Sequence, residues 1–143
     1  MNKTSRVAVI IPQHREEIFP DEQISLRHLD HYLPGVPRIV VRPQRLKNSL
    51  PGCDSIAFAD SYFTGADAYS KLLLSPAFYD SFSNYDYILI YQLDCLVFSS
   101  ELERWCDLGC DYIGAPLFEK NDARPKFSRV GNGGLSLRRV RGF

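Results

Sequence analysis

The stretch YILIYQLDCLVF at residues 87–98 is the most apolar run of the chain, and one acidic residue, Asp94, lies within it. Such a run of aliphatic and aromatic residues predicts a buried strand. A lone carboxylate in an apolar interior costs several kcal/mol or more unless a cation or several hydrogen-bond donors meet it. Asp94 therefore needs a partner. The partner is either a ligand at the end of the strand or a basic side chain such as Arg104.

The rest of the chain alternates predicted strands with predicted helices. The β-branched run VAVIIP at residues 7–12 predicts a buried strand in the centre of a sheet. Further strands are predicted at residues 38–42, 55–59, 111–116 and 135–137, and helices at residues 21–33, 66–74, 76–82 and 100–109. Ser75 is expected to cap the helix at 76–82, and Ser100 with Glu103 forms a capping-box pattern before the last helix. This order predicts a single α/β domain over residues 1–143, with a largely parallel sheet flanked by helices.

Polar residues follow three of the predicted strands, at Gln13–His14, Asp60–Ser61 and Gln92–Asp94. Right-handed crossovers bring the carboxyl ends of parallel strands to one edge of the sheet, where ligands bind in folds of this kind. We therefore expect these three polar ends to face a common crevice. This arrangement favours a ligand, rather than an arginine, as the partner of Asp94.

The composition is that of an ordinary globular protein, with 45% apolar and 24% charged residues among 143. The 17 basic residues balance the 17 acidic ones, so no net positive field favours nucleic acid as a partner. The first apolar run, residues 7–11, is too short for a signal peptide or a transmembrane segment. The expectation is a soluble cytoplasmic protein.

The four cysteines, Cys53, Cys95, Cys106 and Cys110, form no C-x-x-C pair, which predicts reduced thiols in a cytoplasmic protein. A zinc site that joins Cys106 and Cys110 to His28 and His31 is conceivable. Structural zinc sites have tighter and more regular ligand spacing than this.

Three features could carry chemistry. Gln92 and Asp94, two residues apart on one face of a strand, can offer oxygens to a divalent cation that in turn holds phosphates. Lys71 lies on a predicted helix and either reaches a pyrophosphate as a point charge or is simply solvated.

The third feature is Gly131-Asn132-Gly133-Gly134. Its glycines let the backbone approach a ligand closely, or its Asn-Gly pair forms a hairpin turn. The basic cluster Arg138, Arg139 and Arg141 that follows is a ligand-binding or a solvated face. Neither the dinucleotide fingerprint G-x-G-x-x-G nor a phosphate loop of the type G-x-x-x-x-G-K occurs.

Taken together, several stretches resemble a bacterial family of uncharacterised, glycosyltransferase-like proteins: VAVIIP at 7–12, KLLLSPAFY at 71–79, YQLDCLVF at 91–98, DYIGAP at 111–116 and VGNGGLSL at 130–137. That family is similar to the GT-A glycosyltransferases, whose Rossmann-like domain binds a nucleotide-sugar and, through an Asp-x-Asp motif, manganese or magnesium. The resemblance implies a GT-A-type fold that transfers a sugar from a nucleotide diphosphate donor to an unknown acceptor.

The resemblance also assigns residues. It implies that Asp94 is the second acid of the metal motif, with Gln92 in place of the first, and that Mn²⁺ or Mg²⁺ binds there. Lys71 matches a lysine that approaches the donor phosphates. Pro12, Gln13 and His14 match the loop at the nucleotide, while Asn132, Gly133 and Gly134 match the loop beside the sugar or acceptor. An amide is a weaker cation ligand than a carboxylate, so Gln92 lowers the expected affinity for the metal.

The chain ends soon after the glycine-rich segment, whereas GT-A enzymes continue with further segments for the acceptor. The expectation is a domain truncated at its C-terminus, in which no residue is named as the catalytic base. Two functions stay open: a glycosyltransferase, or a non-catalytic nucleotide-binding or interaction module.

Overall fold

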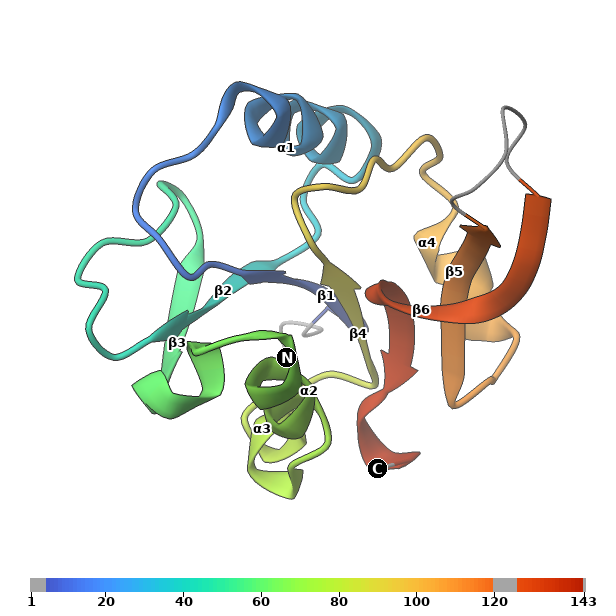
Figure 1. Ribbon diagram of the computed structural model, residues 1–143. Helices are drawn as coiled ribbons and strands as arrows, with labels where there is room; N and C mark the ends of the chain where they lie inside the picture. Colours follow the sequence, from blue (N-terminus) through green and yellow to red (C-terminus); the bar gives the residue numbers. More distant parts are fainter. Residues whose placement is uncertain (1–4, 120–125, 143) are drawn as a thin grey trace.

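In the computed structural model, residues 5–119 and 126–142 are described, and they form a six-stranded sheet with helices on both faces (Figure 1). The strands are β1 (Val7–Pro12), β2 (Arg38–Pro43), β3 (Asp54–Phe58), β4 (Tyr87–Tyr91), β5 (Tyr112–Glu119) and β6 (Lys126–Arg139). The α-helices are α1 (Pro20–Tyr32), α2 (Ala66–Leu73), α3 (Pro76–Asp80) and α4 (Leu102–Asp107), with 3₁₀ turns η1 (Asp60–Phe63) and η2 (Val140–Gly142). The predicted α/β class is confirmed.

The sheet is mostly parallel, as predicted, and its strand order is β3-β2-β1-β4-β6-β5. Strands β3, β2, β1 and β4 run parallel, while β6 is antiparallel to both β4 and β5. From β1 the chain first builds outward through β2 and β3, and then returns to the other side of β1 with β4. The gap between β1 and β4 is therefore the topological switch point, where ligands bind in open α/β sheets.

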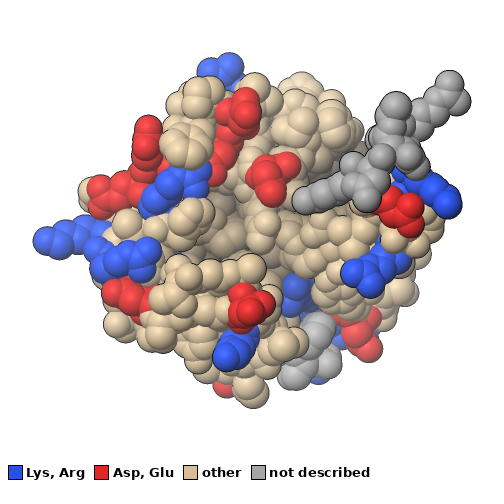
Figure 2. All heavy atoms as spheres, in the orientation of Figure 1, with Lys and Arg blue, Asp and Glu red and all other residues tan. Residues whose placement is uncertain are grey.

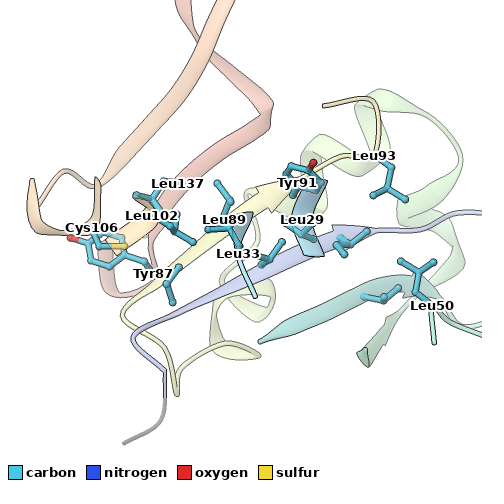
Figure 3. Packing of buried hydrophobic residues seen from close by; sticks show 14 residues of the cluster. Leu29, Leu33, Leu50, Tyr87, Leu89, Tyr91, Leu93, Leu102, Cys106 and Leu137 are labelled. Carbon is cyan, nitrogen blue, oxygen red and sulfur yellow. The ribbon is translucent and has the colours of Figure 1, made fainter. Parts of the chain in front are cut away.

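Two apolar layers hold the helices to the sheet. Side chains of β1 alternate between them with the period of two that a strand imposes: Val7, Val9 and Ile11 face one layer, and Ala8 and Ile10 the other. Figure 3 shows the first layer, where Leu29 of α1 and Leu102 of α4 pack on β4. The second layer holds α2 through Leu72 and α3 through Phe78, and Phe82, which follows α3, packs in the same layer. Burying each such side chain stabilises the fold by about 1.5–3 kcal/mol.

The apolar run at residues 87–98 is not one strand, and this corrects the sequence interpretation. β4 ends at Tyr91, and the chain then turns out of the sheet, so Asp94 is exposed and Phe98 is 67% exposed. The turn is tied to α1 because the hydroxyls of Ser25 and Tyr91 both reach the Cys95 carbonyl, at 2.6 and 3.1 Å. The cost expected for a buried carboxylate at Asp94 therefore does not arise.

The predicted break between α2 and α3 is confirmed, and the Ser75 hydroxyl accepts the Phe78 N–H at 3.3 Å. The capping box predicted for α4 is wrong. That helix begins at Leu102, and the cap position is Glu101, whose own N–H donates to the Ser99 hydroxyl at 3.1 Å. The Glu101 carboxylate is held by Arg104 at 2.7 Å.

The glycine-rich segment lies inside the long strand β6, so the interpretation of Asn132-Gly133 as a hairpin turn is wrong. Pairing between β5 and β6 passes from Gly114↔Ser136 to Ala115↔Asn132, which leaves residues 133–135 bulged away from β5. Leu135 still pairs with Tyr91 on the opposite side. The bulge therefore faces the carboxyl end of β4.

Across residues 5–119 and 126–142, no helix has the length and apolar character needed to cross a bilayer.

Candidate functional site

A cleft of ≈ 390 Å³ opens at the carboxyl ends of β1 and β4, at the switch point of the sheet. In the space-filling view this face of the molecule is hollowed at its centre (Figure 2). Residues that follow β1, residues that follow β4, the start of α1 and the start of α2 line it: Pro12, Gln13, His14, Arg15, Glu17, Ile18, Glu22, Phe63, Gly65, Ala66, Tyr69, Gln92, Leu93 and Asp94. Five of the predicted site residues, Pro12, Gln13, His14, Gln92 and Asp94, are thus brought together.

The β1 side of the cleft is fixed by the backbone. Gln13 continues the sheet by donating its N–H to the Val41 carbonyl at 2.8 Å, and only 6% of the residue is exposed. Its side-chain Nε2 donates to the Arg15 carbonyl at 2.8 Å. His14 is exposed, and its Nε2 lies 3.0 Å from Arg15 Nη1, which donates to it.

The β4 side presents Gln92 and Asp94. The Gln92 N–H donates to the Gly134 carbonyl at 2.9 Å, so this residue still pairs with the bulged segment of β6. In the part of the chain that the structure describes, Asp94 forms no ion pair, because Arg104 binds Glu101 instead. The carboxylate is exposed at the mouth of the cleft, with the Cys95 thiol 3.5 Å from Oδ1.

The cleft lining is acidic. Among its described residues, three carboxylates (Glu17, Glu22 and Asp94) face one guanidinium, that of Arg15. Arg15 is already bound to Glu22 at 2.7 Å and lies 4.1 Å from the Phe19 ring centroid. A diphosphate would therefore meet net negative charge here unless a cation comes with it.

Three polar atoms of the described chain are buried without a hydrogen-bond partner: Gln13 Oε1, Arg15 Nε and the Tyr69 hydroxyl. All three residues line the cleft. Leaving such a group unsatisfied costs about 1–3 kcal/mol, so these atoms are suited to receive polar groups of a ligand. Burial raises the pKa of Tyr69, while the charge of Arg138 opposes that rise, and Tyr69 stays a protonated donor at neutral pH.

Sequence reasoning missed Arg15 and Tyr69 as site residues. Arg15 directly follows Gln13-His14, so the same strand-end argument could have included it. Tyr69 lies two residues before Lys71 on the same helix, and a tyrosine in a helix gives no sign in the sequence of whether its hydroxyl finds a partner.

The other predicted residues lie outside the cleft lining. Lys71 borders a separate shallow depression formed by residues 64–68, next to the cleft at Gly65 and Ala66. Gly134 reaches the cleft only through Gln92, and its N–H donates to Asn132 Oδ1 at 2.9 Å. Gly133 lies beside Arg138.

The Asp60–Ser61 pair does not line the cleft, contrary to the expectation of a common crevice. Residues 60–63 form the 3₁₀ turn η1, and the Asp60 carboxylate accepts the Arg45 N–H at 2.9 Å. Only Phe63 from this turn reaches the lining.

Gln92 and Asp94 fit a cation whose remaining ligands come from elsewhere. Within the described ranges, no three His, Cys, Asp or Glu side chains gather to hold a metal ion. His28, for example, contacts the Val97 carbonyl at 2.9 Å through Nδ1. Mg²⁺ is commonly held by one or two carboxylates together with substrate phosphates and water. The Asp94 carboxylate and the Gln92 amide suit a cation that is shared with substrate phosphates and water. They are too few to hold a cation by protein ligands alone.

The fold is that of an α/β protein with a mostly parallel sheet. Its cleft lies at the switch point, where proteins of this class bind their ligands. By sequence the chain belongs to the family DUF5672, described as proteins of unknown function, whose profile matches residues 52–143. The matched part includes Tyr69, Gln92, Asp94 and the glycine-rich segment, but not Pro12, Gln13 and His14. No curated protein matches the chain.

Proposed function

We propose that this protein is a GT-A-type glycosyltransferase that moves a sugar from a nucleotide diphosphate donor to an acceptor. One observation carries the proposal: the ends of β1 and β4 meet in one cleft at the switch point, and unpartnered buried polar atoms line it. The resemblance of five stretches to glycosyltransferase-like proteins supports the same class.

In this proposal the two halves of the cleft have different tasks. Pro12, Gln13 and His14 border the nucleotide, with Gln13 Oε1 as a free acceptor for a base or ribose donor. Gln92 and Asp94 would hold Mn²⁺ or Mg²⁺, which would supply positive charge for the leaving diphosphate. By holding a cation, Asp94 would bring in the positive charge that offsets the acidic lining, which would otherwise repel the donor.

Transfer then requires an acceptor hydroxyl to attack the anomeric carbon as the bond to the diphosphate breaks. The Tyr69 hydroxyl can donate to an oxygen of the ligand, because the described residues leave it without a partner. Glu17 and His14 are lining groups that can accept a proton. Apolar side chains at Ile18, Phe63 and Leu93 would exclude water from the ligand.

A second candidate is a nucleotide-binding module without turnover. Gln92 favours it, since an amide in place of an acid leaves one negative charge fewer for the cation. The lack of a third acidic or imidazole ligand in the described residues also favours it.

Titration calorimetry with UDP-sugars and GDP-sugars, with and without MnCl₂, tests the proposal. We expect binding that depends on Mn²⁺ and that weakens about tenfold or more in Asp94→Asn. Asp80→Asn is the matched control, because Asp80 is exposed at the end of α3, outside the cleft lining. No binding of any nucleotide-sugar, or equal binding by wild type and Asp94→Asn, refutes the proposal.

Turnover separates the two candidates. A glycosyltransferase hydrolyses its donor slowly when acceptor is absent, so release of UDP or GDP that depends on Mn²⁺ and on Asp94 supports transfer. Binding without any release supports the module.

A further inference from the structure

Arg138 is a buried cation with neutral partners. Only 5% of the residue is exposed. Its Nη1 donates to the Tyr79 hydroxyl at 2.9 Å and to the Leu73 carbonyl at 3.4 Å, and its Nε donates to the Ser136 hydroxyl at 3.1 Å. The guanidinium carbon also lies 5.2 Å from the Tyr112 ring centroid. None of these groups carries a negative charge to balance the guanidinium.

Six other arginines of the described chain have a counter-ion. Ion pairs within the described ranges engage Arg6, Arg15, Arg38, Arg45, Arg104 and Arg139, and Arg138 takes part in none of them. The contrast is sharpest with its neighbour Arg139, which points to the opposite side of β6 and binds Asp111 at 3.0 Å. A buried charge without a counter-ion is costly, so Arg138 is suited to receive an anion from outside the chain.

Gly133, in the bulge of β6, lies beside this guanidinium. A methyl group at Gly133 would lie 3.4 Å from Arg138 Nη2 and 3.9 Å from the Tyr112 hydroxyl. Within the residues the structure describes, no hydrogen bond from Nη2 accompanies those of Nη1 and Nε. Because Gly133 has no side chain, nothing from this residue covers Nη2, a donor that makes no hydrogen bond within the described residues.

Gly133 and Arg138 lie outside the cleft lining and are linked to it through neighbouring residues. Gly134, the next residue, lies against Gln92, whose side chain lines the cleft. On the other side, the charge of Arg138 acts on Tyr69, another lining residue, where it opposes the rise in pKa that burial causes. A ligand that fills the cleft near Gln92 can thus extend a group toward Arg138.

We propose that Arg138, beside Gly133, is a subsite for an oxyanion, a carboxylate or a phosphate, carried by the ligand of the cleft. If the ligand is a nucleotide-sugar with its acceptor, which rests on the proposed function, the subsite selects an acidic sugar or a phosphorylated acceptor. A guanidinium suits this task because its planar fork binds carboxylate and phosphate with two parallel hydrogen bonds.

Side-chain NMR tests the subsite with probes that contain no nucleotide. The ¹⁵Nε–¹Hε resonance of Arg138, assigned by its loss in Arg138→Lys, is followed while wild type is titrated with glucuronate, inorganic phosphate or glucose. We expect saturable shifts with glucuronate or phosphate, at concentrations at least tenfold below any effect of glucose. A response to glucuronate alone identifies a carboxylate, and a response to phosphate alone identifies a phosphate.

Variants test whether the effect belongs to Arg138. Both variants lack the Arg138 Nε–Hε resonance, so the affinity of each variant and of wild type is taken from the backbone amide shift of Gly133, which lies beside Arg138. Arg138→Gln is expected to lower the affinity for the responding anion at least tenfold. Arg138→Lys, which keeps the charge, is expected to give an affinity between those of Arg138→Gln and wild type. Arg141→Gln removes the same charge from an exposed residue of η2 and should bind like wild type. Circular dichroism establishes that each variant is folded.

Two results overturn the subsite: neither anion shifts the Arg138 resonance more than glucose does, or Arg138→Gln or Arg138→Lys binds the anions as wild type does. Because no probe contains a nucleotide, a failure of nucleotide-sugar binding leaves this test intact.

Discussion

Gln92 packs its side-chain amide against Gly134, where a methyl group would come within 2.7 Å of Gln92 Oε1. The bulged segment of β6 thereby sets where one of the two predicted cation ligands can lie. A glycine at this position acts on the cleft from a strand whose own residues do not line it.

We predict that Gly134→Ala weakens Mn²⁺-dependent ligand binding severalfold while it changes the free energy of unfolding by less than about 1 kcal/mol. The reason is that the atom in the way is the far end of a flexible side chain, which can rotate at little cost. Titration calorimetry and urea denaturation measure the two effects. Binding unchanged from wild type would show that the position of the Gln92 amide does not matter.

Gly114→Ala is the contrasting variant. A methyl group there would lie 2.5 Å from the Gly131 Cα and 2.7 Å from the Gly131 carbonyl carbon, so strand backbone must move. We expect a loss of about 1–3 kcal/mol in the free energy of unfolding, as for overpacked sites. If Gly114→Ala lowered the free energy of unfolding as little as Gly134→Ala does, the backbones of β5 and β6 could move apart at little energetic cost.

Gln92→Asp should raise the affinity for Mn²⁺ about tenfold or more. The substitution adds a second carboxylate two residues from Asp94, and carboxylates bind hard cations more strongly than amides do. Calorimetric titration with MnCl₂, in the absence and presence of UDP, measures the change. The double variant Gln92→Asp with Asp94→Asn is the control, since it restores the wild-type charge, and it should lose most of the gain.

The strands and most helices could be predicted because their signals are local. The continuous burial of residues 7–11 follows from a run that faces apolar layers on both sides. Ser75-Pro76 marks a helix start whatever the helix packs against. The juxtaposition of Gln13 with Gln92 and Asp94 also followed, from the rule that parallel strands end at one edge.

The predictions that failed concern features that depend on contacts between residues far apart in the sequence. The end of β4 at Tyr91 is set by hydroxyls on α1 and β4 that capture the Cys95 carbonyl, and no feature of the run itself encodes that. The bulge at residues 133–135 needs both β4 and β5 as neighbours, so the glycines alone could not distinguish it from a turn. The burial of Arg138 needs Tyr79 and Leu73, far away in the sequence.

The hydroxyl of Tyr91 should contribute to both stability and binding. Tyr91 is fully buried, and its hydroxyl accepts from the Ser25 hydroxyl at 2.9 Å while it lies 3.1 Å from the Cys95 carbonyl. We predict that Tyr91→Phe lowers the free energy of unfolding by about 1–2 kcal/mol. It should also weaken nucleotide-sugar binding, because the turn that carries Asp94 loses a tie to α1. Urea denaturation and calorimetry provide the measurements.

Tyr62→Phe is the control for Tyr91→Phe. Tyr62 is half-buried, and within the described part of the chain its hydroxyl has no hydrogen bond, so its removal should change stability by less than about 0.5 kcal/mol. Equal effects of the two variants would contradict the role assigned to the hydroxyl of Tyr91.

Stability should fall at alkaline pH through two thiols, those of half-buried Cys95 and buried Cys106. Burial, with the Asp94 charge and hydrogen bond as further causes, raises the pKa of Cys95 to about 12, and burial raises that of Cys106 to about 11. An unfolded cysteine titrates near pH 8.5, so above that pH the unfolded state binds fewer protons than the folded state, and the free energy of unfolding declines. The stabilising contribution of the two protonated thiols is complete below about pH 8.5 and is lost as the pH rises toward 11–12.

Urea denaturation at intervals from pH 7.5 to about 10.5 should give a shallower decline in the free energy of unfolding for Cys95→Ala than for wild type. Cys110→Ala, at an exposed position, should follow wild type, and a Cys95→Ala slope that also matches wild type would contradict the assignment.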